Sequence, residues 1–368
     1  MVRMSDNGHG RRTFLQVAAA GAALLTKAVR AGADENTPPK DPKEAGKGPT
    51  APEPPAAGEV KLAKGSKVGR RKLGSTGVEV SMVGLGGFHL GLPSEAEAIR
   101  IVHTALDHGI DFLDNCWDYN DGKSEERLGK ALAHGKRKHA FVMTKLDGRT
   151  AESARGQLEQ SMKRLKTDMI DLVQIHEVIR PTDPDRCFAD GGCIEALLEA
   201  RKAGKLRFIG FTGHKDPSIH LAMLDRAAKA GFNFDTVQMP LNALDAHFRS
   251  FGQLVLPRLV QEKIGVLGMK SLGAGEILKA RVAEARELLR YSLSLPTSVV
   301  ITGCDSIGVV EQAIDVALKF KPMSDEETKE LLARTATVAA TGKYEAFKTT
   351  QTFDGTEQHK HWLEEARL

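Results

Sequence analysis

The sequence has too few residues of the kinds on which several classes of protein depend. Its four cysteines are too few for a disulfide-built fold, and no two have the C-x2-C spacing of metal-binding pairs. No apolar run is long enough to span a bilayer. The net charge of +4 gives no basis for nucleic-acid binding. We therefore expect a globular protein with no metal, no nucleic-acid partner and no stable membrane span.

Two nucleotide and metal motifs are also missing. Gly84-Leu85-Gly86-Gly87 lacks the third glycine of G-x-G-x-x-G, which excludes a standalone dinucleotide-binding fingerprint. His176-Glu177 does not continue as H-E-x-x-H, the helical zinc motif. Any cofactor must therefore bind in another way.

The first 33 residues are typical of a secretory signal. Arg11-Arg12-Thr13-Phe14-Leu15 precedes a small apolar run at 17–25, and Ala31-Gly32-Ala33 provides an A-x-A cleavage site. The paired arginines resemble a twin-arginine signal. We expect export by the twin-arginine translocase to the periplasm or cell envelope of a bacterium. The alternative is a short amphipathic helix with a chance arginine pair.

Residues 34–66 form a different kind of segment, rich in Pro, Gly, Lys, Glu and Ala. Its seven prolines prevent a regular helix or a central strand. This composition predicts a disordered linker between the signal and the folded domain.

From Arg71 onward, short apolar runs alternate with amphipathic segments. The expected strands are 80–85, 110–114, 140–145, 169–176, 206–211, 234–238, 265–269 and 298–301. The clearest helical patterns are 94–108, 124–133, 151–165 and 193–203. Eight units spaced by about thirty residues predict an α/β fold, a (β/α)8 TIM barrel over 67–322. A C-terminal helix and tail follow over 323–368, and an open doubly wound sheet is the structural alternative.

Polar residues end three successive predicted strands, at Asp114, Lys145 and His176, and Tyr119 follows in the loop after Asp114. Working residues of such a barrel lie at the carboxyl ends of its strands, so we expect these four to converge. An ammonium lowers the pKa of a nearby phenol, which would suit Tyr119 to proton transfer. Taken singly, each residue has a structural alternative. These are an ion pair for Asp114 and Lys145, a core histidine for His176 and a surface loop aromatic for Tyr119.

The segments that carry these residues resemble the aldo/keto reductase family. The matching segments are Arg71–Gly77, Gly84–Gly86, Asp114–Gly129 with its G-x-S-E run, Thr144-Lys145 and Asp171–His176. The likeness covers roughly Arg70 to Phe320. It implies an NAD(P)(H)-dependent oxidoreductase acting on a small carbonyl or alcohol, with Tyr119 as general acid/base. Asp114 and Lys145 would tune Tyr119, and His176 would orient the substrate.

The resemblance also implies where a nicotinamide cofactor binds. Thr212 and Gln238 stand where the family holds the carboxamide, although Gly213 replaces the family's amide side chain. Met269 takes the place of a tyrosine that stacks on the nicotinamide, as a softer cover. Lys270 is placed to reach the pyrophosphate as a point charge.

At the adenosine end, the residues of this sequence do not match the cofactor that the family usually binds. Family resemblance favours NADP(H), but Gly303 and Val309 stand where a lysine and an arginine often hold its 2′-phosphate. Asp305 would repel a phosphate, so NAD(H) stays open. Gln312 is expected to face the adenine.

The substrate is not specified by the residues expected around the mouth. Phe88, His89 and Trp117 are expected near the rim, under an overhanging loop at 177–192 and a tail around 344–348. Cys187 and Cys193 bracket part of that loop, and pairing in an oxidising compartment and free buried thiols are both open.

Two other functions compete with the oxidoreductase. An exported barrel that keeps its nucleotide pocket for binding or assembly is one, since free nicotinamide nucleotide should be scarce outside the cytoplasm. A hydrolase or aldolase that uses Lys145 as a Schiff base is the other.

Overall fold

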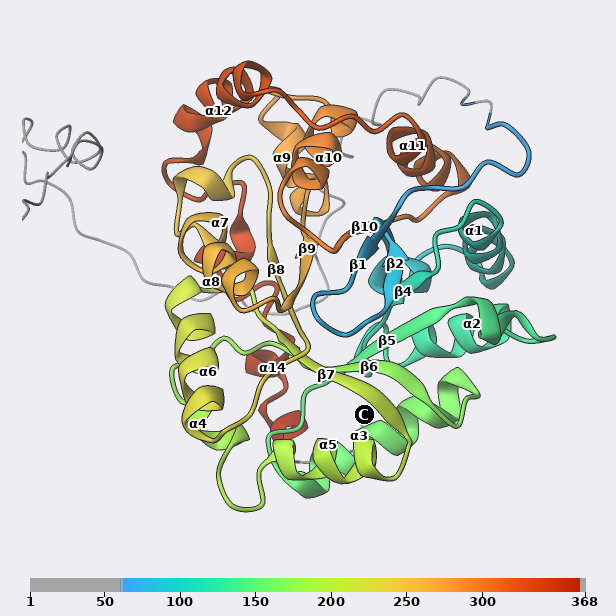
Figure 1. The fold of residues 1–368 in the computed structure, drawn as a ribbon, viewed down its shortest axis with the longest axis vertical. Coiled ribbons are helices and arrows are strands. Elements are labelled where there is room, and N and C mark those ends of the chain that lie inside the picture. The colour runs from blue at the N-terminus through green and yellow to red at the C-terminus, as the bar shows by residue number, and fades with distance from the viewer. Residues whose placement is uncertain (1–59, 61, 365–368) are drawn as a thin grey trace, which may run out of the picture. The chain divides into compact units, whose positions relative to one another are not determined.

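The computed structural model describes residues 60 and 62–364, and these contain a closed barrel of eight parallel strands (Figure 1). The strands pair in the order β10-β3-β4-β5-β6-β7-β8-β9. Their bounds are β3 (Val83–Gly86), β4 (Phe112–Asp114), β5 (Phe141–Leu146), β6 (Ile170–Ile175), β7 (Leu206–Thr212), β8 (Thr236–Pro240), β9 (Gly265–Met269) and β10 (Val299–Gly303). The predicted (β/α)8 barrel is confirmed, and the open sheet is excluded. The predicted signal, 1–33, and most of the linker lie outside the described residues.

Helices follow the barrel strands and surround them (Figure 1). The main ones are α1 (Glu95–Asp107), α2 (Lys123–Ala131), α3 (Ala151–Leu165), α5 (Cys193–Lys202), α6 (Pro217–Lys229), α8 (Leu256–Gln261), α10 (Ala285–Ser294) and α11 (Ile307–Leu318). Shorter helices lie in the loops: α4 (Asp183–Cys187), α7 (Phe251–Leu254), α9 (Glu276–Lys279), η1 (Gly87–Gly91), η2 (Lys136–His139), η3 (Asp245–His247) and η4 (Gly273–Gly275). In the described part of the chain, no helix is both long and apolar enough to cross a bilayer.

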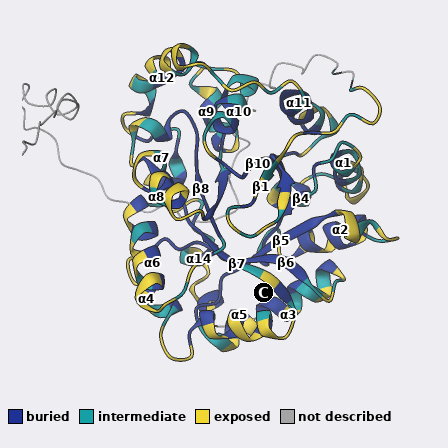
Figure 2. Cartoon of the chain, in the orientation of Figure 1, coloured by how far each residue is buried: buried dark blue, intermediate teal, exposed yellow. Residues whose placement is uncertain are grey.

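The helices begin where side chains can accept the first free backbone N–H groups. Ser94 caps α1, and capping boxes start α3 at Thr150 and α12 (Asp325–Ala339) at Ser324. Each helix then turns its apolar stripe inward, so the strands are buried and the helices are exposed on their outer faces (Figure 2).

The predicted strand at 80–85 is in fact two strands. β2 (Glu79–Ser81) pairs antiparallel with β1 (Arg70–Lys72), and β3 continues into the barrel. The chain bends between them, where the Ser81 hydroxyl donates to the Val83 carbonyl and accepts from the Phe112 N–H. The hairpin residues Leu73 and Val80 pack in one buried cluster with side chains from the barrel strands. The hairpin therefore adds apolar packing to the barrel interior.

The end of the chain returns to the loops that follow β5 and β6. It contains α13 (Ala346–Thr349), α14 (Gly355–Gln358) and η5 (Lys360–Leu363), coloured red in Figure 1. The carboxylate of Glu177, just after β6, accepts hydrogen bonds from the backbone N–H groups of Gly355 and Thr356 at 2.9 and 2.8 Å. The Trp362 ring stands edge-on to Trp117, with centroids 5.7 Å apart. The tail is thus fixed by buried polar and aromatic contacts.

A buried guanidinium joins the same two loops. Arg149 is fully buried and forms an ion pair with Asp183 over 3.1 Å. It also donates to the backbone carbonyls of Asp147, His176 and Glu177 at 2.6, 2.7 and 2.9 Å. Because Glu177 has a left-handed backbone, with φ of 45°, these bonds stabilise a strained turn.

We predict that Arg149→Met lowers the free energy of unfolding by about 3–5 kcal/mol, because it removes the buried cation beside Asp183 and leaves that carboxylate only its longer, 3.6 Å ion pair with Arg180. Urea unfolding followed by circular dichroism measures the change. Arg155→Met is the matched control: Arg155 pairs with Glu199 at the surface, so we expect little change. Equal stability of the Arg149 variant and the control would contradict a structural role for this ion pair.

Candidate active site

The ammonium group of Lys145 on β5 is the centre of a polar cluster at the carboxyl end of the barrel. Lys145 is buried and forms an ion pair with Asp114, the last residue of β4. Its Nζ donates to the Asn115 carbonyl at 2.8 Å and to the Tyr119 hydroxyl at 3.2 Å. Gln238 donates to the other Asp114 oxygen at 3.0 Å. The strands therefore bring Asp114, Lys145 and Tyr119 together as the sequence indicates.

Tyr119 is held among aromatic rings as well as by Lys145. Its ring meets those of His176 and Phe88 edge-on, with centroids 5.8 and 5.5 Å away. Burial raises the pKa of its phenol well above the ordinary value, and the charge of Asp114 adds to the rise. The expectation of a lowered pKa is therefore wrong for this site, because burial outweighs the ammonium. The phenol is protonated at neutral pH.

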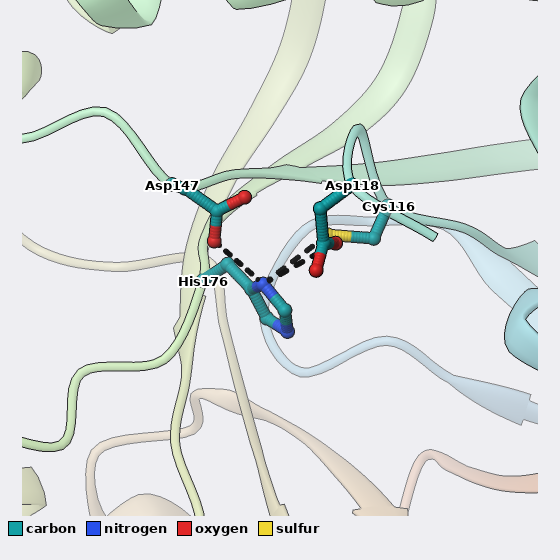
Figure 3. Close-up of side chains that lie close together, drawn as sticks. All are labelled: Cys116, Asp118, Asp147 and His176. Carbon is teal, nitrogen blue, oxygen red and sulfur yellow. Dashed lines mark hydrogen bonds and ion pairs between the residues drawn. The ribbon is translucent and has the colours of Figure 1, made fainter. Parts of the chain in front are cut away.

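His176 completes the group just beyond β6. It is buried, and burial lowers the pKa of its imidazole, so the ring is neutral at pH 7. Its Nδ1 lies 2.8 Å from an oxygen of Asp147. Cys116 and Asp118, from the loop after β4, complete a close cluster of four side chains around this nitrogen (Figure 3).

The acids in this cluster are shifted by their surroundings. Burial, followed by the charge of Glu177, raises the pKa of Asp147 to about 8. Burial, followed by the charge of Asp147, raises the pKa of Asp118 to about 7. Burial opposes the ionisation of Glu177, but His176, His214 and hydrogen bonds from Thr356 hold its pKa below the usual value. Glu177 is thus the ionised member of this neighbourhood.

Gln238 and Thr212 fit the expected binding of a carboxamide. The side-chain oxygen of Gln238 is buried and has no hydrogen-bond partner within the described residues. An amide N–H of a bound carboxamide would satisfy it. The Thr212 hydroxyl, at the end of β7, has the Met269 sulfur 4.0 Å away. Thr212 and Gln238 are therefore paired across neighbouring strands, and Thr212 lies close to Met269, the expected cover of the ring.

The glycine that departs from the family pattern has a steric reason. A Cβ on Gly213 would stand 2.3 Å from the carbonyl oxygen of Val178, in the loop after β6. The backbones also bond here, because the Val178 N–H donates to the Thr212 carbonyl at 2.8 Å. An amide side chain cannot occupy position 213 without moving the loop that follows His176.

Lys270 is covered by the tail. Its Nζ lies 5.0 Å from the ring centroids of both Phe347 and Phe353, a cation–π arrangement. Burial lowers the pKa of Lys270 to about 8, while Glu177 opposes the shift. Phe347 is thus buried over Lys270, in the tail segment that the sequence placed at the mouth.

The remaining expected cofactor residues surround the start of α11. A Cβ on Gly303 would stand 2.1 Å from His89, so the imidazole packs directly against this glycine. Asp305 is exposed and Gln312 is half-buried on α11. Burial lowers the pKa of His89, opposed by the charge of Asp305, so this expected substrate residue lies beside the residues expected at the adenosine end.

The two aromatic residues expected in the substrate pocket have different surroundings. Phe88 is 46% exposed and touches Tyr119, so it stands at the open side of the site. Trp117 is fully buried, and its indole N–H donates to Gln160 at 2.8 Å. The structure brings Phe88 to Tyr119 but leaves Trp117 packed against Trp362 of the tail. Cys187, also buried, carries a free thiol, as does Cys193.

Sequence reasoning missed Asp147 and Asp118. Asp147 follows Lys145 by two residues, and Asp118 precedes Tyr119 directly, so both are close in sequence to the predicted site. Their common contact, Nδ1 of His176, depends on how three loops meet, and no local pattern signals that. The useful signal is the presence of acids beside residues already assigned to the site.

Comparisons with known proteins identify the family to which this sequence is similar. The model of the Aldo/keto reductase family matches residues 82–290, which include Asp114, Tyr119, Lys145 and His176. The aldo-keto reductase YhdN of Bacillus subtilis (strain 168) is 33% identical over 228 residues, 58% of this chain and 64% of that protein. The match therefore spans less than two thirds of that relative. L-galactose dehydrogenase of Arabidopsis thaliana is 29% identical over 305 residues, 72% of this chain and 92% of that protein.

A solved structure shares the fold. The aldo-keto reductase AKR11C1 from Bacillus halodurans, in its holo form, is 24% identical and superposes with a TM-score of 0.61. The superposition covers 73% of this chain and 96% of that one. The family match over most of the barrel, together with this fold, identifies the chain as a member of the aldo/keto reductase family of oxidoreductases.

Proposed function

We propose that this protein reduces aldehydes or ketones to alcohols, or runs the reverse reaction, with Tyr119 as general acid/base. The observation that carries the proposal is the 3.2 Å approach of the Lys145 ammonium to the Tyr119 hydroxyl, inside a buried site. Family membership supports an oxidoreductase. The unpartnered oxygen of Gln238 supports a nicotinamide nucleotide, NADP(H) or NAD(H), as its cofactor.

Each residue has a physical role in this scheme. A bound nicotinamide nucleotide would supply or accept the hydride. Tyr119 keeps its proton at neutral pH and donates it to the oxygen that becomes an alcohol. The phenolate that remains lies beside Lys145, whose positive charge stabilises it. Asp114 holds the ammonium in place, and His176 donates a hydrogen bond that orients the carbonyl.

We predict that Tyr119→Phe lowers kcat for aldehyde reduction by about 10²–10⁴-fold, because the proton donor is lost while the ring remains. A panel of aldehydes assayed with NADPH and NADH gives the measurement. Nucleotide affinity, read by fluorescence quenching, should be unchanged. Tyr291→Phe is the matched control, since this residue lies on α10 and belongs neither to the group of Asp114, Tyr119, Lys145 and His176 nor to the tail.

The same assay separates the competing functions. Full activity in the Tyr119 variant would contradict the acid/base assignment. Tight nucleotide binding with no turnover by the unmodified protein would instead favour the binding or assembly role. Trapping of a carbonyl compound on Lys145 by borohydride would favour a Schiff-base enzyme, although this lysine is held in an ion pair with Asp114.

The choice between nucleotides centres on Asp305. Family resemblance favours NADP(H), whereas an exposed carboxylate at the adenosine end disfavours a 2′-phosphate. We predict that Asp305→Asn tightens NADPH binding by about three- to tenfold and leaves NADH unchanged, because only NADPH carries the repelled phosphate. Fluorescence titration of both nucleotides measures this, and Asp325→Asn, on α12, is the control. An equal effect on both nucleotides would place Asp305 elsewhere than beside the 2′-position.

We also propose that the protein is exported in folded form by the twin-arginine translocase and works in the periplasm or cell envelope. The Arg11-Arg12-Thr13-Phe14-Leu15 run and the A-x-A site at Ala31–Ala33 support this. The test expresses the full-length chain in a bacterial host and looks for its mature form in the periplasmic fraction. Changing Arg11 and Arg12 to lysine should abolish that form. Arg30→Lys, near the predicted cleavage site, should leave export intact; export of the double variant would contradict the proposal.

A further inference from the structure

One nitrogen of His176 meets three groups that could exchange protons with it. Nδ1 lies 2.8 Å from Asp147 Oδ1, 3.3 Å from Cys116 Sγ and 3.7 Å from Asp118 Oδ1. Figure 3 shows the other ring nitrogen, Nε2, turned away from all three side chains. The environment of Nδ1 therefore decides which nitrogen of the neutral ring carries the hydrogen.

The proposed reaction requires one particular tautomer. A neutral imidazole has a single N–H, and only an N–H on Nε2 can reach a carbonyl on the open side of the ring. Nδ1 must then accept a hydrogen bond, so one of its neighbours must donate. An ionised Asp147 would have the opposite effect: it would draw the hydrogen to Nδ1 and leave Nε2 without a donor.

Asp147 lies where a negative charge on its carboxylate would have few hydrogen-bond donors or free cations to stabilise it. Its side chain is fully buried, and its second oxygen has no hydrogen-bond partner within the described residues. The cations nearby are already paired: Lys145 with Asp114, Arg149 with Asp183, and Arg180 with Glu357. A neutral carboxyl group in this position leaves one uncharged oxygen unpaired, which costs less than an unpaired charge.

We propose that Asp147 is a positioning residue that keeps its proton, donates it to Nδ1 of His176 and so holds the ring hydrogen on Nε2, facing the substrate carbonyl. This inference rests on the proposed reductase function and adds a residue to its machinery. The hydrogen bond also fixes the orientation of the ring, as outer partners of functional histidines do.

The pKa shifts of Asp147 and His176 agree with this placement of the proton. Burial raises the pKa of Asp147 to about 8, with Glu177 adding to the rise, and burial lowers the pKa of His176. At neutral pH the shared proton therefore belongs to the carboxyl group. The titratable and charged groups around Asp147 are Cys116, Asp118, Lys145, Arg149, His176, Glu177 and Arg180.

Two other arrangements of the cluster are less consistent with its distances. Ligands that share a tetrahedral zinc at about 2.0–2.3 Å stand more than about 3 Å apart. The 2.8 Å between Asp147 and His176 is instead a hydrogen-bond length. The Cys116 thiol is a second possible donor, but it has the Lys145 carbonyl 3.6 Å away as an acceptor.

Nitrogen-15 NMR of the histidine-labelled protein reads the tautomer directly. The His176 signals are assigned by their loss in His176→Gln. We expect Nε2 protonated and Nδ1 bare at pH 6.5, with that state lost as the pH rises through about 8 and Asp147 ionises. Asp147→Asn should keep the same tautomer at all these pH values, because the amide donates without titrating. Cys116→Ala should leave the wild-type titration unchanged.

Kinetics adds a readout that a purely structural role would not change. For the wild type, kcat/KM for reduction should fall as the pH rises through about 8, and Asp147→Asn should lack this fall or show it shifted upward. Asp147→Leu, which has no donor, should lower kcat/KM about 10–100-fold with nucleotide affinity retained. Circular dichroism checks that each variant is folded.

The outcomes separate this inference from the proposed function. A wild-type ring with hydrogen on Nδ1 at pH 6.5 would overturn it, and so would His176 signals that shift when EDTA removes a bound metal. A tautomer flip in Cys116→Ala would also overturn it, because the thiol would then be the donor. An Nε2–H tautomer set by Asp147, in a protein that turns over no carbonyl, would support the inference and reject the reductase.

Discussion

A positive charge buried inside the mouth of the barrel determines how the residues around it are arranged. The Lys145 ammonium has no access to bulk water, so its hydrogen bonds must come from the protein. Asp114 supplies the opposite charge, a backbone carbonyl accepts a second bond, and the Tyr119 hydroxyl takes the remaining direction. Gln238 then satisfies the other oxygen of Asp114, while its own side-chain oxygen has no partner among the described residues. The requirement to satisfy one ammonium thus aligns residues from β4, β5 and β8.

A second buried charge organises the loops beside this centre. Arg149 donates to the backbone carbonyls of His176, Glu177 and Asp147. One guanidinium therefore holds the backbone of both His176 and Asp147, whose side chains are hydrogen-bonded to each other. Glu177, the next residue, reaches the tail through Thr356. The orientation of His176 therefore depends on a set of buried contacts that extends into the tail at Thr356. Few of these contacts involve a residue that would meet a substrate.

Local sequence patterns were sufficient to predict the barrel and the grouping of Asp114, Tyr119, Lys145 and His176, because both depend on short-range features. Strand period, helix caps and the position of a polar residue at a strand end are readable from neighbours in the sequence. The hairpin before the barrel was missed because Ser81 bends an apolar run that reads as one strand. Asp147 was missed because its role comes from where His176 lies, 29 residues away. The pKa of Tyr119 was predicted in the wrong direction, since burial is a property of the whole fold.

The docked tail has a consequence for how the molecule is made. Thr356 and Trp362 are synthesised after every strand of the barrel, yet they contact Glu177 and Trp117, which follow β6 and β4. The eight barrel strands are therefore available for pairing before residues 355–362 have been made. The tail can dock only on loops whose strands were synthesised earlier, so its contacts are among the last that the described part of the chain can form.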